Sequence, residues 1–139
     1  MAGFVGRYEH SLDTKGRVIL PAKFRAAFDR GGYLTEHREG CLALFTPGEF
    51  ERQMEAMQEQ AASGRTQRNR ARLWASNSHE VEVDRQGRMA IPAHLREFAT
   101  LSGDVLVHGA IDRLELGNPA VWDERVRPDE SWFLDDEDE

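Results

Sequence analysis

The chain has 139 residues, enough for one domain of ordinary size or for two very small ones that share a core. Apolar residues make up 40% and charged residues 31%, a balance that excludes wholesale disorder, and no apolar run reaches the roughly 18 residues of a membrane span. The net charge of -7 comes from residues 129–139, which hold seven acids and no base and leave the rest of the chain neutral.

The start of the chain and its cysteine content favour a cytoplasmic protein. Residues 1–7 have no basic region followed by a long apolar stretch, so we expect no signal peptide. The single cysteine, Cys41, has no intrachain partner for a disulfide. A reducing compartment is therefore expected.

An internal repeat organises the sequence. Residues 13–25 read DTKGRVILPAKFR and residues 84–96 read DRQGRMAIPAHLR, so both fit D-x-x-G-R-h-h-h-P-A-x-h-R, where h is apolar. The similarity continues from residues 33–53 to residues 105–125. We expect two halves of about fifty residues each, built on one plan.

In the first half, the motif predicts a β-hairpin turn. Asp13 can accept backbone N–H bonds at the first position of a type I turn, and Gly16 can adopt a positive φ as a glycine bulge. Residues 18–20 then predict a short strand. Alternation places Arg17 on the face opposite Val18, away from the expected core.

Pro21 follows this strand directly and predicts a helix over residues 21–29, because its fixed φ suits a first helical turn. Phe24 and Phe28 are four residues apart and share one face of that helix. We expect both of them in the core.

Residues 33–36 and 41–45 predict a pair of strands, after which Thr46 caps a helix that begins at Pro47. Glu49 can reach back to complete a capping box. A break near residues 63–64 precedes a second helical stretch over about 66–75.

Four arginines crowd around this second helical stretch: Arg65, Arg68, Arg70 and Arg72. They could run along DNA, meet an acidic neighbour, or form an ordinary solvated surface.

The second half repeats the plan. Its turn, strands and helices are expected at residues 84–87, 89–91, 92–99, 105–108 and 113–116, with Asn118 capping a last helix at Pro119. Leu95 and Ala99 repeat the apolar spacing of Phe24 and Phe28. Neither half is large enough to bury a good core alone, so we expect the two to interlock in one barrel-like β core.

The doubled motif resembles the MraZ family and, more distantly, the swapped-hairpin DNA-binding domains of the AbrB and MazE type. The resemblance extends from Phe4 to about Trp122. It implies a cytoplasmic, nucleoid-associated transcription factor that binds double-stranded DNA sequence-specifically and assembles into a homo-oligomeric ring, an octamer or larger. Its implied targets are short direct repeats upstream of the division and cell-wall gene cluster that includes its own gene.

With this resemblance, the expected fold class is α+β, a pseudo-twofold double-split β-barrel of two tandem β-β-α-β-β-α repeats with flanking helices. We expect a first AbrB-like repeat over 1–63, a helical linker over 64–76, a second AbrB-like repeat over 77–128 and an acidic, disordered segment over 129–139.

The resemblance also implies that the Asp and Arg of each motif carry the DNA-binding surface. Arg17 and Arg88 are the expected contacts, and the expected orienters of the motif are Asp13, Asp84, Gly16 and Gly87. The alternative is that each arginine merely braces its own turn through its aspartate, although an exposed pair of this kind contributes only about 0–1 kcal/mol.

Further DNA-binding candidates are Lys15 and Arg85 at the turn tips and Arg25 and Arg96 in the helices, with Lys23 beside them. Ordinary solvated charge is the alternative for each. Gln86 replaces Lys15 in the second turn, so the two faces need not bind equally strongly.

No enzyme, metal site, cofactor or small-molecule substrate is expected. The five histidines and Cys41 lack zinc-ligand spacing, and no nucleophile elbow or phosphate loop is present. Two other functions stay open: an antitoxin-like partner protein of the same hairpin class, and a purely structural ring. Residues 129–139 could be a solubilising end, a toxin-binding segment, or a competitor with DNA for the arginine face.

Overall fold

Fourteen elements follow one another along the chain in this computed structural model, which describes residues 3–131. The first half contains β1 (Arg7–Ser11), β2 (Arg17–Ile19), η1 (Ala22–Phe28), β3 (Gly32–Glu36), η2 (Arg38–Gly40), β4 (Leu42–Phe45), α1 (Pro47–Ala61) and α2 (Arg65–Asn77). The second contains β5 (His79–Val81), β6 (Arg88–Ala90), α3 (Ala93–Phe98), β7 (Asp104–Gly109), β8 (Leu114–Gly117) and α4 (Pro119–Arg125). The repeated order predicted for the two halves is confirmed.

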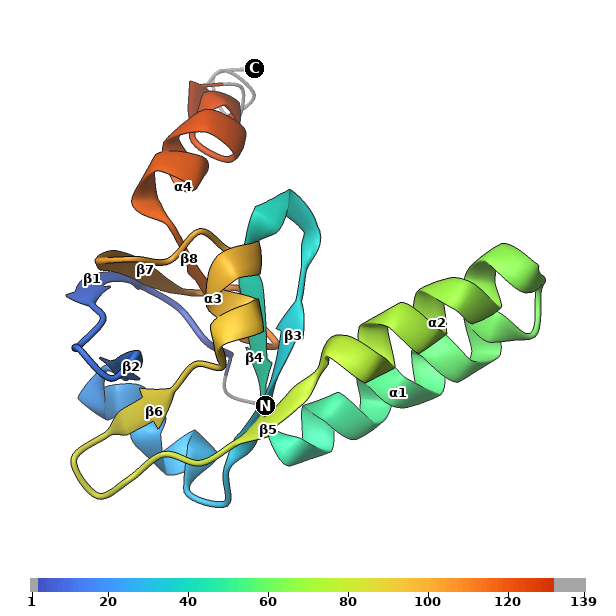
Figure 1. Cartoon of the computed structure of the whole chain (residues 1–139), viewed down its shortest axis with the longest axis horizontal. Coiled ribbons are helices and arrows are strands. Elements are labelled where there is room, and N and C mark those ends of the chain that lie inside the picture. Colours follow the sequence, from blue (N-terminus) through green and yellow to red (C-terminus); the bar gives the residue numbers. More distant parts are fainter. Residues whose placement is uncertain (1–2, 132–139) are drawn as a thin grey trace.

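The strand pairing interlocks the two halves (Figure 1). Six strands form one antiparallel sheet in the order β1-β7-β8-β4-β3-β5, and β2 pairs with β6 in a separate two-stranded ribbon. If each strand is replaced by its counterpart in the other half, the order becomes β5-β3-β4-β8-β7-β1, which is the same order read from the opposite edge of the sheet. The architecture is therefore α+β with an internal pseudo-twofold relation between the repeats.

The hairpin predicted around each turn is confined to the residues next to the turn, and in the second half it extends to the antiparallel bridge between Val83 and Met89. The turn closes locally, since Asp13 N donates to Arg17 O at 2.9 Å and Gly16 N to Asp13 O at 3.1 Å. Beyond these bonds β1 pairs with β7 and β2 with β6, so both strands find their partners in the other half. Likewise β5 pairs with β3.

One core lies between the ribbon and the six-stranded sheet. Val18 of β2 and Met89 of β6 are fully buried, as are Leu44 and Leu116 at the centre of the sheet, and all belong to one apolar cluster. Burying side chains of this size stabilises the fold by about 1.5–3 kcal/mol each. The predicted core residues of the two short helices are also confirmed as buried: Phe24, Phe28, Leu95 and Ala99.

The two short helices differ in type. The helix predicted over 21–29 is a 3-10 helix over Ala22–Phe28, in which Phe24 N donates to Pro21 O at 2.9 Å. Its counterpart α3 is α-helical, because Arg96 N reaches Pro92 O at 3.0 Å. A helix of only two turns gains little from propagation, so the two hydrogen-bond patterns compete closely.

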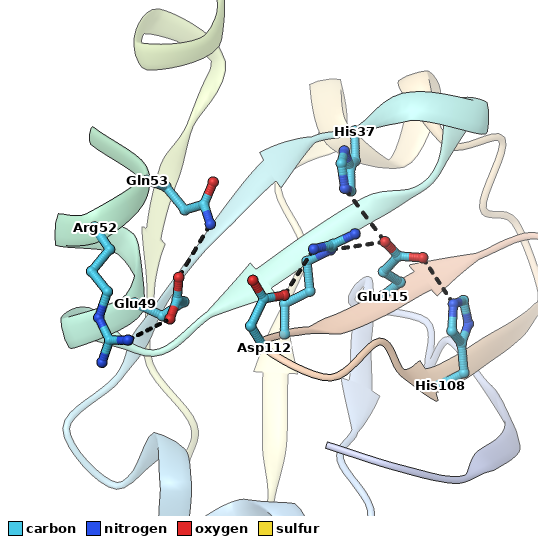
Figure 2. Close-up of polar contacts among 8 residues, drawn as sticks. His37, Glu49, Arg52, Gln53, His108, Asp112 and Glu115 are labelled. Carbon is cyan, nitrogen blue, oxygen red and sulfur yellow. Dashed lines mark hydrogen bonds and ion pairs between the residues drawn. The ribbon is translucent and has the colours of Figure 1, made fainter. Parts of the chain in front are cut away.

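Helices α1 and α2 form a hairpin that projects from the sheet on the side away from β2 and β6 (Figure 1). Thr46 caps α1 as predicted, since its hydroxyl accepts from Glu49 N at 3.3 Å. The Glu49 carboxylate does not complete the predicted capping box; it accepts from Gln53 and pairs with Arg52 (Figure 2). At the base of the hairpin, Phe50 stacks on Trp74 at 5.0 Å between ring centres.

The strand pairings of residues 3–131 form these two sheets and by themselves close no barrel, so the double-split barrel stays a prediction. The predicted domain bounds also stay predictions. Over the same residues, no helix has the length and apolar character needed to cross a membrane.

Candidate nucleic-acid interface

The β2–β6 ribbon places both motif arginines on one outer face. Its register pairs Arg17 with Ala90, Val18 with Met89, and Ile19 with Arg88. Directly opposed residues share a face, so Val18 and Met89 point into the core while the other four residues point outward. Ile19 is 44% exposed, which confirms the outer face predicted for Arg17 and Arg88.

Each turn holds its arginine through the aspartate of the same motif. Asp13 Oδ1 accepts from the backbone N–H groups of Lys15 and Arg17 at 2.8 and 2.9 Å, and Asp13 Oδ2 accepts from Arg17 Nε at 2.8 Å. Asp84 makes the same three contacts with Gln86 and Arg88, at 2.9, 2.9 and 2.7 Å. The two turns are therefore near copies in three dimensions.

These contacts keep the aspartates ionised. The hydrogen bond from the Arg17 backbone N–H, followed by the Arg17 side-chain contact and the Lys15 N–H, lowers the pKa of the Asp13 carboxyl below its ordinary value. The corresponding contacts of Arg88 and Gln86 lower the pKa of Asp84. At neutral pH each arginine thus has a charged partner that fixes its direction.

Bracing the turn and contacting a ligand do not exclude each other here. Within residues 3–131, the side chains of Arg17 and Arg88 use only Nε for their aspartates, at 2.8 and 2.7 Å. Both Nη groups of each guanidinium keep their donors for an outside acceptor. The arginine side chains are 28% and 32% exposed, so such an acceptor can reach them.

Of the five remaining basic candidates, Lys23 lies with its Nζ 5.1 Å from the centre of the Tyr8 ring and 5.0 Å from that of Phe24, and the other four fall into two pairs. Lys15 and Arg85 are exposed at the turn tips, as predicted. Arg25 and Arg96 are half-buried and do not project outward: each lies against the turn glycine of the other repeat, Gly87 and Gly16 respectively. An open groove of about 860 Å³ runs beside the ribbon and is lined by residues that include Arg17, Arg88 and Arg96.

The turn glycines meet the backbone requirement predicted for them. Gly16 has a φ of 76° and Gly87 a φ of 83°, the left-handed region that side chains other than glycine seldom adopt. Both are buried although the turn tips next to them are exposed, because the arginines of the opposite repeat cover them.

A second polar cluster lies on the sheet and was missed by the sequence analysis (Figure 2). Glu115 accepts from Arg113 Nε at 2.9 Å, contacts His108 Nε2 at 2.9 Å and lies 3.4 Å from His37 Nε2. Burial raises the pKa of Glu115, but hydrogen bonds from His108 and Arg113 and the Arg113 charge outweigh it, and the pKa falls to about 2.

This cluster depends on the register that places His108 opposite Glu115, which no local motif encodes. Over the described part of the chain, no three metal-binding side chains come together there or elsewhere. The cluster joins β7, β8 and the end of β3, so its role in this structure is to tie strands together.

The arginines of α2 are exposed and lie on the hairpin that projects away from the ribbon (Figure 1). Of the acidic segment, residues 129–131 belong to a helical turn after α4, and residues 132–139 lie outside the described residues. Within the described residues, neither the α2 arginines nor residues 129–131 therefore lie at the arginine face of the ribbon.

Comparisons with known proteins agree with the repeat. The family model for the MraZ protein, described as antitoxin-like, matches residues 4–73 and again residues 75–138, so the second match includes most of the acidic segment. A transcriptional regulator MraZ from Kocuria rhizophila is 40% identical over 98% of this chain and 95% of its own length. Proteins of the same name from Micrococcus luteus and Salinispora arenicola are 40% and 36% identical, each over 97% of this chain and 95% of their own length.

Proposed function

The chain belongs to the MraZ family, and we propose that it is a sequence-specific DNA-binding transcriptional regulator. The observation that carries the proposal is the β2–β6 ribbon, which presents Arg17 and Arg88 on one outer face with their Nη donors free of intramolecular partners among residues 3–131. The relatives' printed name, transcriptional regulator, supports the same conclusion.

The proposed docking places the ribbon in the major groove. That groove is about 12 Å wide and admits a two-stranded β-ribbon, and a guanidinium pairs with O6 and N7 of guanine at a gain of roughly 1–3 kcal/mol of discrimination. Lys15 and Arg85 at the tips meet phosphate, and Arg25 and Arg96 add positive charge beside the turns. Asp13 and Asp84 orient the arginines and do not themselves approach the phosphates.

For the architecture, we propose that the ribbon and the six-stranded sheet together form the pseudo-twofold double-split β-barrel. One apolar cluster drawn from both sheets supports this arrangement. The proposed bounds are 1–63 and 77–128 for the two repeats, 64–76 for the helical linker and 129–139 for the acidic segment.

In the cell, we propose a cytoplasmic, nucleoid-associated ring of at least eight subunits. One ribbon offers few phosphate contacts, so tight binding requires several subunits acting together through a raised effective concentration. The proposed targets are direct repeats about 10–10.5 bp apart, upstream of the division and cell-wall genes, which present the same DNA face to neighbouring subunits. Analytical ultracentrifugation of the protein alone tests the ring.

The test of DNA binding is fluorescence anisotropy with the DNA upstream of the protein's own gene, over a range of salt concentrations. Arg17→Ala and Arg88→Ala should each weaken specific binding, whereas Lys15→Ala and Arg85→Ala, which remove the proposed phosphate contacts, should each flatten the salt slope by about 0.9. Arg52→Ala is the matched control, because it removes an exposed arginine from α1 on the projecting hairpin. Binding by the Arg17/Arg88 double variant equal to that of Arg52→Ala would exclude the ribbon as the DNA site.

A second candidate is the antitoxin-like partner protein, which the description of the matching family model favours. In that case residues 129–139, with seven acids around Trp132 to Leu134, are the segment suited to a small basic toxin. Co-purification with such a toxin, lost when residues 129–139 are removed and unaffected by Arg17→Ala, would support it over the DNA-binding proposal.

A further inference from the structure

Arg25 and Arg96 make a reciprocal contact that crosses between the repeats. Each arises from the helix after one motif and lies on the turn of the other motif: Arg25 covers Gly87, and Arg96 covers Gly16. A β-carbon added at Gly87 would overlap the Nε, Cζ and Cδ atoms of Arg25, and one at Gly16 would overlap the guanidinium of Arg96. Nε and Cζ of each arginine therefore lie against the turn glycine of the opposite repeat.

Backbone hydrogen bonds cross at the same two glycines. Leu20 N donates to Gly87 O at 2.8 Å, and Ile91 N donates to Gly16 O at 3.0 Å. Arg25 Nε in turn donates to Leu20 O at 3.1 Å. The residue that bonds the opposite turn is thus itself held by the arginine that covers that turn.

We propose that Arg25 and Arg96 are positioning residues for the DNA-reading arginines of the opposite repeat. Arg25 fixes the turn that aims Arg88, and Arg96 fixes the turn that aims Arg17. The expected effect of these two arginines on DNA binding rests on the proposed function, whereas the crossed positioning itself is a property of the free protein.

The chemistry of these contacts requires an arginine and not merely a cation. Arg25 lies against Gly87 through Nε, Cζ and Cδ, and its Nε donates to Leu20 O at 3.1 Å. A lysine side chain carries the same charge as a point and has no donor at the position of Nε. Arg96 Nε is buried without a partner in the described residues, so packing and not hydrogen bonding holds that side chain in place.

The first test measures the free protein and needs no DNA. In Nε–Hε correlation spectra, Arg25→Ala should shift the Arg88 signal and leave the Arg17 signal in place, and Arg96→Ala should do the reverse. Arg30→Ala, which removes an exposed arginine just after η1, is the control and should shift neither signal. Equal shifts of both signals, or shifts confined to the variant's own repeat, would overturn the crossed assignment.

The second test measures specific DNA binding in double-variant cycles. The double variant Arg25→Ala/Arg88→Ala should bind DNA with a Kd within about twofold of that of Arg88→Ala alone. In the double variant Arg25→Ala/Arg17→Ala, the fold-changes in Kd of the two single variants should instead multiply, to within about twofold. Arg96→Ala should couple to Arg17→Ala in the same way. The spectra and the cycles together show a crossed pattern that a general loss of stability does not produce.

Charge-conserving variants separate positioning from direct contact. Arg25→Lys should bind DNA as poorly as Arg25→Ala and keep the salt slope of the parent protein. Full binding by Arg25→Lys, with a slope flattened by about 0.9 in Arg25→Ala, would make Arg25 a phosphate contact and overturn the proposal. If the crossed spectral shifts are found but the Arg17 and Arg88 variants bind like the parent, the positioning stands and the proposed function fails.

Discussion

Replacing Gly87 by alanine places a methyl group where the Arg25 side chain lies, and it makes an alanine adopt a φ of 83°. Both consequences act at a buried position between the two repeats. The substitution therefore tests, through stability alone, whether Arg25 occupies the turn of the opposite repeat.

The expected loss of stability can be worked out from these contacts. A left-handed alanine costs about 1–2 kcal/mol. Displacing Arg25 Nε from Leu20 O, a bond of 3.1 Å, costs roughly 1 kcal/mol more. Lower entropy of the unfolded chain offsets about 0.5–1 kcal/mol, so the net loss is about 2 kcal/mol. For a chain of 139 residues this lowers the Tm by roughly 6–10 °C.

Thermal and urea unfolding followed by circular dichroism measure the change. Gly48→Ala is the matched control, because Gly48 lies in the first turn of α1 and an added β-carbon meets nothing within 4 Å. That variant should be unchanged or stabilised by up to about 1 kcal/mol. The double variant Gly87→Ala/Arg25→Ala should lose about 1 kcal/mol less than the sum of the single losses, since the hydrogen bond is counted in both.

Two results would refute the reasoning. One is a Gly87→Ala protein within about 0.5 kcal/mol of the parent, the usual range for a surface change away from special features. The other is strict additivity with Arg25→Ala, which would mean that the two residues do not touch.

Three further predictions concern pH, capping and thiol chemistry. The pKa of Glu115 is lowered from 4.5 to about 2, so its ionised carboxylate adds up to ~3 kcal/mol to the free energy of unfolding at pH values above 4.5, and this stability is lost as the pH falls toward 2. In urea unfolding, the difference in stability between the parent and Glu115→Gln should therefore shrink over that pH range. A difference that stays constant would contradict the prediction. Thr46→Ala should lower stability by about 1 kcal/mol in thermal unfolding, and Asn118→Ala somewhat more, because Asn118 also donates to Thr100 O at 2.8 Å; no loss in either would refute the caps. Burial raises the pKa of Cys41 from 9.0 to about 12, which lowers the fraction of reactive thiolate at pH 8. The reaction of Cys41 with iodoacetamide at pH 8 should therefore be roughly a thousandfold slower in the folded protein than in the protein unfolded in urea. Equal rates in the two states would show an exposed thiol.

The sequence could predict whatever depends on a few neighbouring residues. Asp13, Gly16 and Arg17 lie within five positions, and their hydrogen bonds are made within the turn itself. The outward direction of Arg17 follows from alternation along a three-residue strand. The repeated motif therefore predicted both turns and the outer face of the ribbon.

The partners of each strand could not be predicted in this way. An ordinary hairpin and an exchanged one have the same local pattern, because the turn closes identically in both and the strands separate only afterwards. The pairing of β1 with β7 joins residues nearly a hundred positions apart. The places of Arg25 and Arg96 follow from that exchange, so a helical pattern alone indicated only that they lie on short helices.

The palindromic strand order has a consequence for how a binding site can be oriented. A ribbon made by two identical chains offers the same side chains on both strands, so it suits a DNA sequence equal to its own reverse complement. Here both strands belong to one polypeptide, and they already differ: Lys15 stands where the second turn has Gln86, and Ile19 where the second strand has Ala90. Because the two halves are fused in one chain, the two strands of the ribbon are not equivalent. The DNA site that the ribbon recognises can therefore be asymmetric and have a defined orientation along a promoter.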